Sequence, residues 1–109
     1  MTPAPQPYPR PDAFDRRPMS REDAETIART LRAIADPTRL QLLSMLHGSS
    51  DKEATVGDLA ERLGLRAPTI SHHLKIMFED GLLDRDQRGR QVWYSIHPNR
   101  RASIADLLR

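Results

Sequence analysis

Residues 55–80, TVGDLAERLGLRAPTISHHLKIMFED, contain two short helical patterns separated by a glycine. Thr55 is followed by Asp58 in the capping-box position, so we expect a helix to begin after Thr55. Gly64 ends this pattern as a left-handed cap, and Pro68 suits the first turn of a second helix that runs to Asp80. Two helices joined by a short turn that contains glycine form a helix-turn-helix.

The second of these helices has two unlike faces. At ~100° per residue, Ile70, Leu74 and Met77 share one side, whereas His72 and Lys75 point nearly opposite. In such motifs the second helix enters the major groove, where hydroxyl, imidazole and ammonium groups can bond to bases or phosphates. We therefore predict a DNA-binding face that starts at Arg66 and Ala67 and includes Thr69, Ser71, His72, His73 and Lys75.

A predicted β-hairpin follows directly. Leu82 and Leu83 begin one strand and residues 92–96 form the other, with Arg88-Gly89-Arg90 as the turn between them. We expect Arg88 and Arg90 to contact the DNA backbone or the neighbouring minor groove. Taken alone, the two arginines fit an ordinary solvated turn equally well.

Helices are predicted on both sides of this unit. Ser20 caps a first helix that ends near Ala35, and Asp36-Pro37 begins a second, apolar one. A short last helix follows His97-Pro98. The predicted fold is mainly α-helical with a β-hairpin wing (α+β): four helices, a hairpin and a fifth helix, as in a winged helix-turn-helix.

Composition bounds the protein class. Residues 1–18 hold six of the nine prolines and no apolar stretch, which predicts a disordered tail ahead of one domain at residues 19–109. The absence of cysteine excludes disulfides and thiolate sites. No apolar run approaches the ~18 residues of a membrane span, so we expect a soluble, cytoplasmic protein without membrane partners.

Charge is distributed unevenly. Residues 66–109 carry eight Lys or Arg against five Asp or Glu, whereas residues 1–65 carry nine against ten. The C-terminal part is therefore better suited to meet phosphates. No cysteine nucleophile, phosphate-binding glycine loop or spaced His-Glu set is present, so we do not expect an enzyme.

Several motifs together resemble the ArsR/SmtB family of winged-helix repressors. The similarity covers about residues 20–108, and its motifs stand in order: ADPTRL (35–40), TVGDLA (55–60), PTISHHLK (68–75), GLL (81–83) and RGRQVWY (88–94). The resemblance implies a homodimer built from the first and last helices, and repression of a promoter until an inducer, usually a metal or metalloid, lowers DNA affinity. The apolar residues available for that interface are Ile27, Leu31, Ile34, Ile104, Leu107 and Leu108.

The chain departs from the family pattern at the inducer sites. Thr55 and Gly57 stand where arsenic and cadmium sensors carry Cys-x-Cys, and Pro98 and Arg100 stand where zinc and cobalt sensors begin their last-helix site. Arg66 also replaces a frequent capping serine, and Ala67 a commonly polar DNA-contacting residue. We therefore predict no cofactor and no metal at the usual sites. The inducer is left open, and a His-only site across the dimer from His47 or His97 stays an alternative.

Two functions compete. One is a dimeric repressor that binds a double-stranded DNA operator, and the other is a winged-helix protein-interaction module without specific DNA binding. A protein-docking surface more often carries aromatic or apolar anchors than hydroxyls and imidazoles. Since Thr69, Ser71, His72 and Lys75 include no such anchor, the residues favour the repressor.

Overall fold

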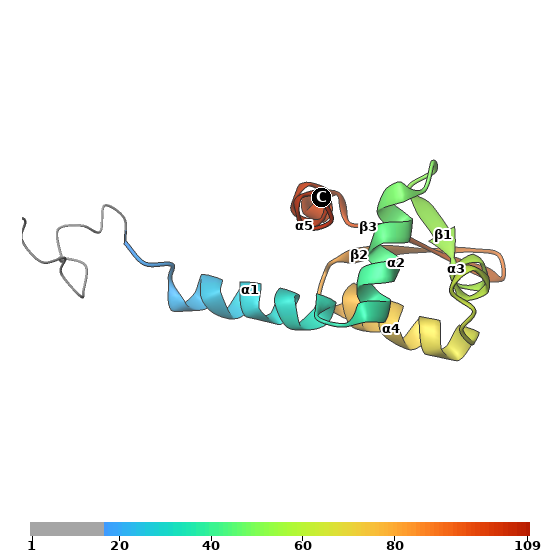
Figure 1. Ribbon diagram of the computed structural model, residues 1–109, viewed down its shortest axis with the longest axis horizontal. Helices are drawn as coiled ribbons and strands as arrows, with labels where there is room; N and C mark the ends of the chain where they lie inside the picture. The colour runs from blue at the N-terminus through green and yellow to red at the C-terminus, as the bar shows by residue number, and fades with distance from the viewer. Residues whose placement is uncertain (1–16) are drawn as a thin grey trace, which may run out of the picture.

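The computed structural model describes residues 17–109, so the predicted tail lies outside the described residues except for Arg17 and Pro18. The elements follow one another as predicted, with one added strand and a short 3-10 turn (Figure 1). Their bounds are α1 Arg21–Ile34, α2 Pro37–Gly48, β1 Glu53–Thr55, α3 Val56–Leu63, α4 Ala67–Glu79, β2 Leu83–Arg88, β3 Gln91–Ile96, η2 Pro98–Arg100 and α5 Arg101–Leu107.

The predicted helix caps are confirmed. Ser20 Oγ accepts the Asp23 N–H at 3.1 Å, and Asp36 Oδ2 accepts the Arg39 N–H at 3.0 Å. Thr55 Oγ1 accepts the Asp58 N–H of α3 at 3.1 Å. Each bond satisfies a first-turn donor that has no partner within its helix, which explains why the helices begin at these residues.

The turn between α3 and α4 also has the predicted geometry. Gly64 has a φ of 67°, the left-handed region that favours glycine, and its N–H bonds to the Ala60 and Glu61 carbonyls. The Leu65 N–H bonds to the Ala60 oxygen at 3.1 Å and closes the cap. After Arg66 the chain enters α4, which begins without a side-chain cap bond.

The sheet has one strand more than the predicted hairpin. Its order is β1-β3-β2, and both pairs are antiparallel. In β1, Glu53 lies opposite Ser95 and Thr55 opposite Trp93. This three-residue strand was not anticipated, because it is too short to show an alternating pattern and pairs with residues far along the chain.

The core fixes how α4 is presented. Ile70, Leu74 and Met77 are each 0% exposed, which confirms the predicted inner stripe of this helix. They pack with apolar residues of the other elements: Ala33, Ile34, Leu42, Leu43, Leu46, Leu59, Ala60, Leu82, Leu83, Tyr94, Ile96 and Ile104. Since three buried residues hold one side of α4, its opposite side faces solvent.

Helix α1 extends away from this body (Figure 1). Its buried residues, Ala33 and Ile34, are both at its C-terminal end, whereas Ile27 and Leu31 are 45% and 53% exposed. A helix of this length is marginal in water without tertiary packing. The exposed apolar side of α1 therefore needs a covering surface that residues 17–109 of one chain do not supply.

Candidate nucleic-acid interface

The outer face of α4 is built from polar residues. Thr69, Ser71, His72 and Lys75 are all exposed, opposite the buried stripe. Lys75 Nζ lies 4.0 Å from Glu79 Oε1, and both side chains are more than 60% exposed. A surface pair of this kind contributes little, so the ammonium group stays available to an anion. Arg66 and Ala67 are exposed at the start of the same helix.

His73 is placed differently from the expected DNA-contacting set. Its side chain is only 17% exposed, and Nδ1 lies 3.8 Å from Asp36 Oδ2 at the start of α2. Arg39 Nε approaches the same oxygen at 3.9 Å. These distances fit ion pairs and exceed those of hydrogen bonds. The structure thus directs His73 toward α2, away from the face that carries His72.

The Asp36 carboxylate is held in its charged form. The Arg39 N–H that bonds to it lowers the pKa of Asp36 below its ordinary value. Partial burial opposes this shift, and Coulombic interactions with His73 and Arg39 reinforce it. Asp36 therefore both caps α2 and supplies the negative charge beside His73 of α4.

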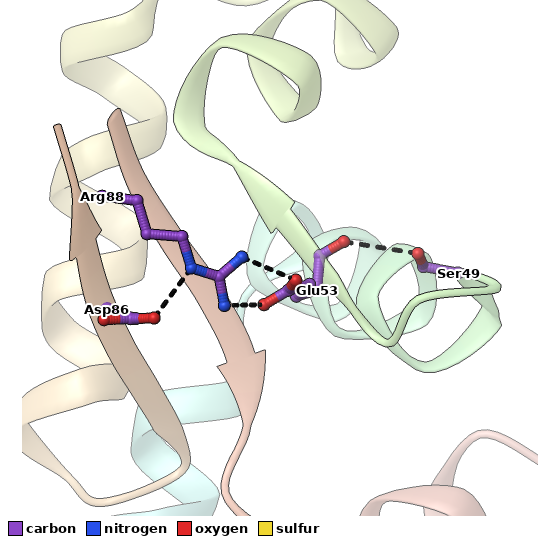
Figure 2. Close-up of polar contacts among 4 residues, drawn as sticks. All are labelled: Ser49, Glu53, Asp86 and Arg88. Carbon is purple, nitrogen blue, oxygen red and sulfur yellow. Dashed lines mark hydrogen bonds and ion pairs between the residues drawn. The ribbon is translucent and has the colours of Figure 1, made fainter. Parts of the chain in front are cut away.

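The two arginines of the wing have different surroundings. Arg90 follows Gly89 at the hairpin tip, is exposed, and forms no ion pair with any residue of the described range 17–109. Arg88 Nε donates to Asp86 Oδ2 at 2.8 Å, and its two Nη atoms donate to the Glu53 carboxylate at 2.8 and 2.9 Å (Figure 2). Arg88 is thus engaged within the protein, whereas Arg90 is not.

A third arginine of the wing contacts the helix-turn-helix. The guanidinium carbon of Arg85, on β2, lies 4.4 Å from the centre of the Phe78 ring on α4. Such a cation–π contact favours a fixed position of β2 against α4. The arrangement joins the predicted recognition helix and the wing by side chains as well as by the chain itself.

The residues at the family's inducer positions have structural roles here. Thr55 is 6% exposed and caps α3, and Gly57 has no side chain to offer. Arg100 Nη1 donates to Thr30 Oγ1 of α1 at 3.3 Å, and Pro98 begins the short turn before α5. Within residues 17–109, no three His, Asp or Glu side chains lie close enough together to hold a metal ion.

The two lone histidines are at element ends. His97 Nε2 lies 3.8 Å from Asp84 Oδ1, and its Nδ1 accepts the Asn99 N–H at 3.1 Å. His47 is in the last turn of α2, where its carbonyl oxygen accepts a hydrogen bond from Lys52 Nζ at 2.7 Å. Both nitrogens of His97 therefore already face a protein group.

The predicted interface residues divide into two groups. Ile27, Leu31 and Leu107 are about half exposed, at 45%, 53% and 50%. Ile34 and Ile104 are buried in the core of the chain itself, and Leu108 packs partly against that core. The exposed group can meet a second chain directly, whereas the buried group supports the helices that carry it.

Sequence reasoning missed three residues that organise this region. Asp36 lies beside both His73 and Arg39, and Glu53 holds Arg88. Asp36 was recognised as a cap, but its contact with α4 depends on tertiary packing. Glu53 lies 35 residues from Arg88, and no local pattern connects the two.

No helix in the described part of the chain combines the length and the apolar character needed to cross a membrane.

Comparison with known proteins gives one consistent result. The family model described as "Bacterial regulatory protein, arsR family" matches residues 36–85. The HTH-type transcriptional regulator NmtR of Mycobacterium tuberculosis is 34% identical over 82% of this chain and 72% of its own length. The transcriptional repressor SdpR of Bacillus subtilis is 36% identical over 61% of this chain and 70% of its own.

A solved structure supports the same grouping. It is the homodimeric winged helix-turn-helix DNA-binding domain of Mb0332 from Mycobacterium bovis, described as a possible ArsR-family transcriptional regulator. It is 26% identical, covers 85% of this chain and 82% of its own, and superposes with a TM-score of 0.66.

Proposed function

The chain belongs to the arsR family of bacterial regulatory proteins, and from that premise we propose that it represses transcription by binding a double-stranded DNA operator as a homodimer. One observation carries the proposal. Helix α4 buries Ile70, Leu74 and Met77 completely while it exposes hydroxyl, imidazole and ammonium groups on its other side. The second helix of a helix-turn-helix needs this division to fill the major groove while it stays attached to the core.

The exposed residues divide by chemistry. Thr69, Ser71 and His72 carry short polar groups that suit base edges, and the methyl group of Ala67 suits the methyl of thymine. Three exposed cations suit phosphates, which position the protein without reading sequence. They are Arg66, Lys75 and Arg90. His73 and Arg88 are left out of the proposed DNA contacts, because the His73 side chain is only 17% exposed beside Asp36 and Arg88 already donates to Glu53.

Dimerisation is proposed through the projecting helix. Ile27 and Leu31 of α1 and Leu107 of α5 are exposed and apolar, and the described part of the chain leaves most of α1 uncovered. A two-fold dimer would place two copies of α4 about 34 Å apart, one turn of the double helix. The operator would then contain two related half-sites. Such a regulator acts where the chromosome is, in the cytoplasm.

We propose further that the releasing signal does not bind at the family's usual metal positions. Thr55 is buried as a cap, a neutral hydroxyl is a poor metal ligand, and Gly57, Pro98 and Arg100 offer no suitable donor. Zn, Co, Ni, Cu and Cd should therefore leave the protein–operator complex intact when titrated under chelator control. Release of DNA by stoichiometric metal at sub-micromolar free concentration would contradict this proposal.

DNA recognition is tested by selection from a random duplex pool. The protein should enrich a sequence with two related half-sites and prefer it to random duplex by at least 10³-fold, the lower end for specific regulators. His72→Ala should reduce this preference, whereas Gln41→Ala, which removes an exposed polar side chain from α2, should not. If no sequence is enriched, the interaction-module alternative replaces the repressor.

A further inference from the structure

The Arg88 side chain is 47% exposed, yet each of its three guanidinium nitrogens donates a hydrogen bond within the protein. Both Nη atoms donate to Glu53 and Nε donates to Asp86, all at 2.8–2.9 Å (Figure 2). The guanidinium carbon also lies 5.1 Å from the centre of the Trp93 ring. Bidentate pairing of a planar guanidinium with a carboxylate is among the strongest polar contacts in proteins, and it fixes orientation as well as distance.

This network does not suit a phosphate contact. One guanidinium and two carboxylates sum to a charge of −1, so the cluster as a whole repels a phosphate group. The Glu53 and Asp86 hydrogen bonds also raise the pKa of Arg88 above its ordinary value. A phosphate would have to displace the bidentate partner, whereas Arg90 has no partner to lose in the described structure.

The position of Glu53 allows the network to connect the wing with the start of the helix-turn-helix. Glu53 is in β1, and β3 separates β1 from the β2 strand that carries Arg88. The contact therefore crosses the sheet and connects its two outer strands. β1 ends at Thr55, the cap of α3, and the Glu53 carbonyl oxygen accepts a hydrogen bond from Ser49 Oγ at 3.3 Å. Through Glu53, the end of the wing is tied to the start of the helix-turn-helix.

We propose that Arg88 is a positioning residue, which uses Glu53 to set the orientation of the wing relative to α3 and α4 and thereby determines DNA specificity. The inference rests on the proposed DNA binding. In an operator, the bases that α4 reads and the phosphates that the wing contacts lie at one fixed spacing. Binding to random DNA depends only on charge. A loosened wing therefore weakens operator binding more than random binding.

The first experiment needs no DNA. Amide hydrogen exchange is measured across β2 and β3 in the full-length protein and in Arg88→Ala, Arg88→Lys, Glu53→Gln and Arg90→Ala. Lysine cannot form the bidentate pair, so we expect faster exchange in the first three variants and unchanged exchange in Arg90→Ala. Unchanged exchange in both Arg88→Ala and Glu53→Gln would overturn the coupling.

The second experiment measures affinity for the selected operator and for random duplex across a salt series. Arg88→Ala, Arg88→Lys and Glu53→Gln should each lower the operator-to-random ratio about tenfold while the salt slope stays unchanged. Arg90→Ala should weaken binding to both duplexes and reduce the slope by about 1 for each phosphate that is no longer neutralised. Glu61→Gln is the matched control for Glu53→Gln, because Glu61 is exposed on α3 and forms no ion pair within residues 17–109.

The opposite role for Arg88 gives opposite results. If Arg88 bound phosphate, Glu53→Gln would free it and strengthen binding to both duplexes, Arg88→Lys would resemble the unmodified protein, and Arg88→Ala would reduce the salt slope. If the unmodified protein discriminates operator from random DNA, any of these outcomes overturns the positioning role of Arg88 and leaves the proposed function standing. Equal affinity of the unmodified protein for the two duplexes overturns the proposed function, and the positioning role with it.

Discussion

Thr55 provides a direct test of how this fold sets the start of its helix-turn-helix. The residue is 6% exposed, and its hydroxyl accepts the Asp58 N–H at 3.1 Å. Thr55→Val keeps the shape and the β-branch but removes the acceptor. Loss of a helix N-cap of this kind destabilises a protein by about 1–2 kcal/mol. Thr55→Ser keeps the acceptor and removes one buried methyl group, for about 0.8 kcal/mol.

The magnitudes predict an order among three variants. Thr55→Ala loses both groups and should be the least stable, by about 2–3 kcal/mol if the two effects add. Ser20→Ala is the matched control: its cap bond is also 3.1 Å long, but the residue is exposed, so we expect a smaller loss. Val should lie between Ser and Ala.

Urea unfolding at one fixed protomer concentration measures these differences, because the stability of a dimer depends on concentration. With a slope of about 1–2 kcal/mol per molar urea for a domain of this size, Thr55→Val should shift the midpoint by about 1 M. If Thr55→Ser loses more than Thr55→Val, methyl packing and not the cap dominates at this position. The Thr55 hydroxyl would then not be what sets the start of α3.

Particular contacts and backbone angles support three further predictions. Gly64→Ala should destabilise the protein by about 1–2 kcal/mol in thermal unfolding, because φ is 67° at this residue. No clash adds to this cost, since an added Cβ meets nothing within 4 Å. Gly64→Asn should lose less stability, because asparagine tolerates this backbone conformation better than alanine. A loss above about 3 kcal/mol would reveal a clash instead. The pKa of Asp36 is lowered in the folded protein, so its charge stabilises the fold at pH values above the ordinary pKa of 3.8. This contribution is lost as the pH falls through the folded-state pKa. Acid unfolding of Asp36→Asn should therefore lack this part of the pH dependence. Leu31→Glu places a charge on the exposed apolar side of α1 and should give monomers by sedimentation, whereas Arg29→Glu, on the same helix, should stay dimeric. A monomeric unmodified protein at micromolar concentration would contradict the dimer.

Local signals in the sequence determined most of the fold. The caps at Ser20, Asp36 and Thr55 and the glycine at residue 64 act within a few residues of where they stand, so the helix boundaries agree with the structure to within about one residue. The inner stripe of α4 follows from helical periodicity alone. The exposed polar face of α4 follows for the same reason, since it is the complement of that stripe.

Tertiary structure decided which side chains remain free to act. His72 and His73 are neighbours of the same type, yet α2 places Asp36 beside only one of them. Arg88 and Arg90 flank one glycine symmetrically, yet the unanticipated strand β1 brings Glu53 to Arg88 alone. Local propensity acts between near neighbours in the chain and sets each helix or strand separately. The partner of a charged side chain depends on elements that meet only after folding. Glu53 is 35 residues from Arg88, and Asp36 is 37 residues from His73, so the sequence alone does not reveal these partners.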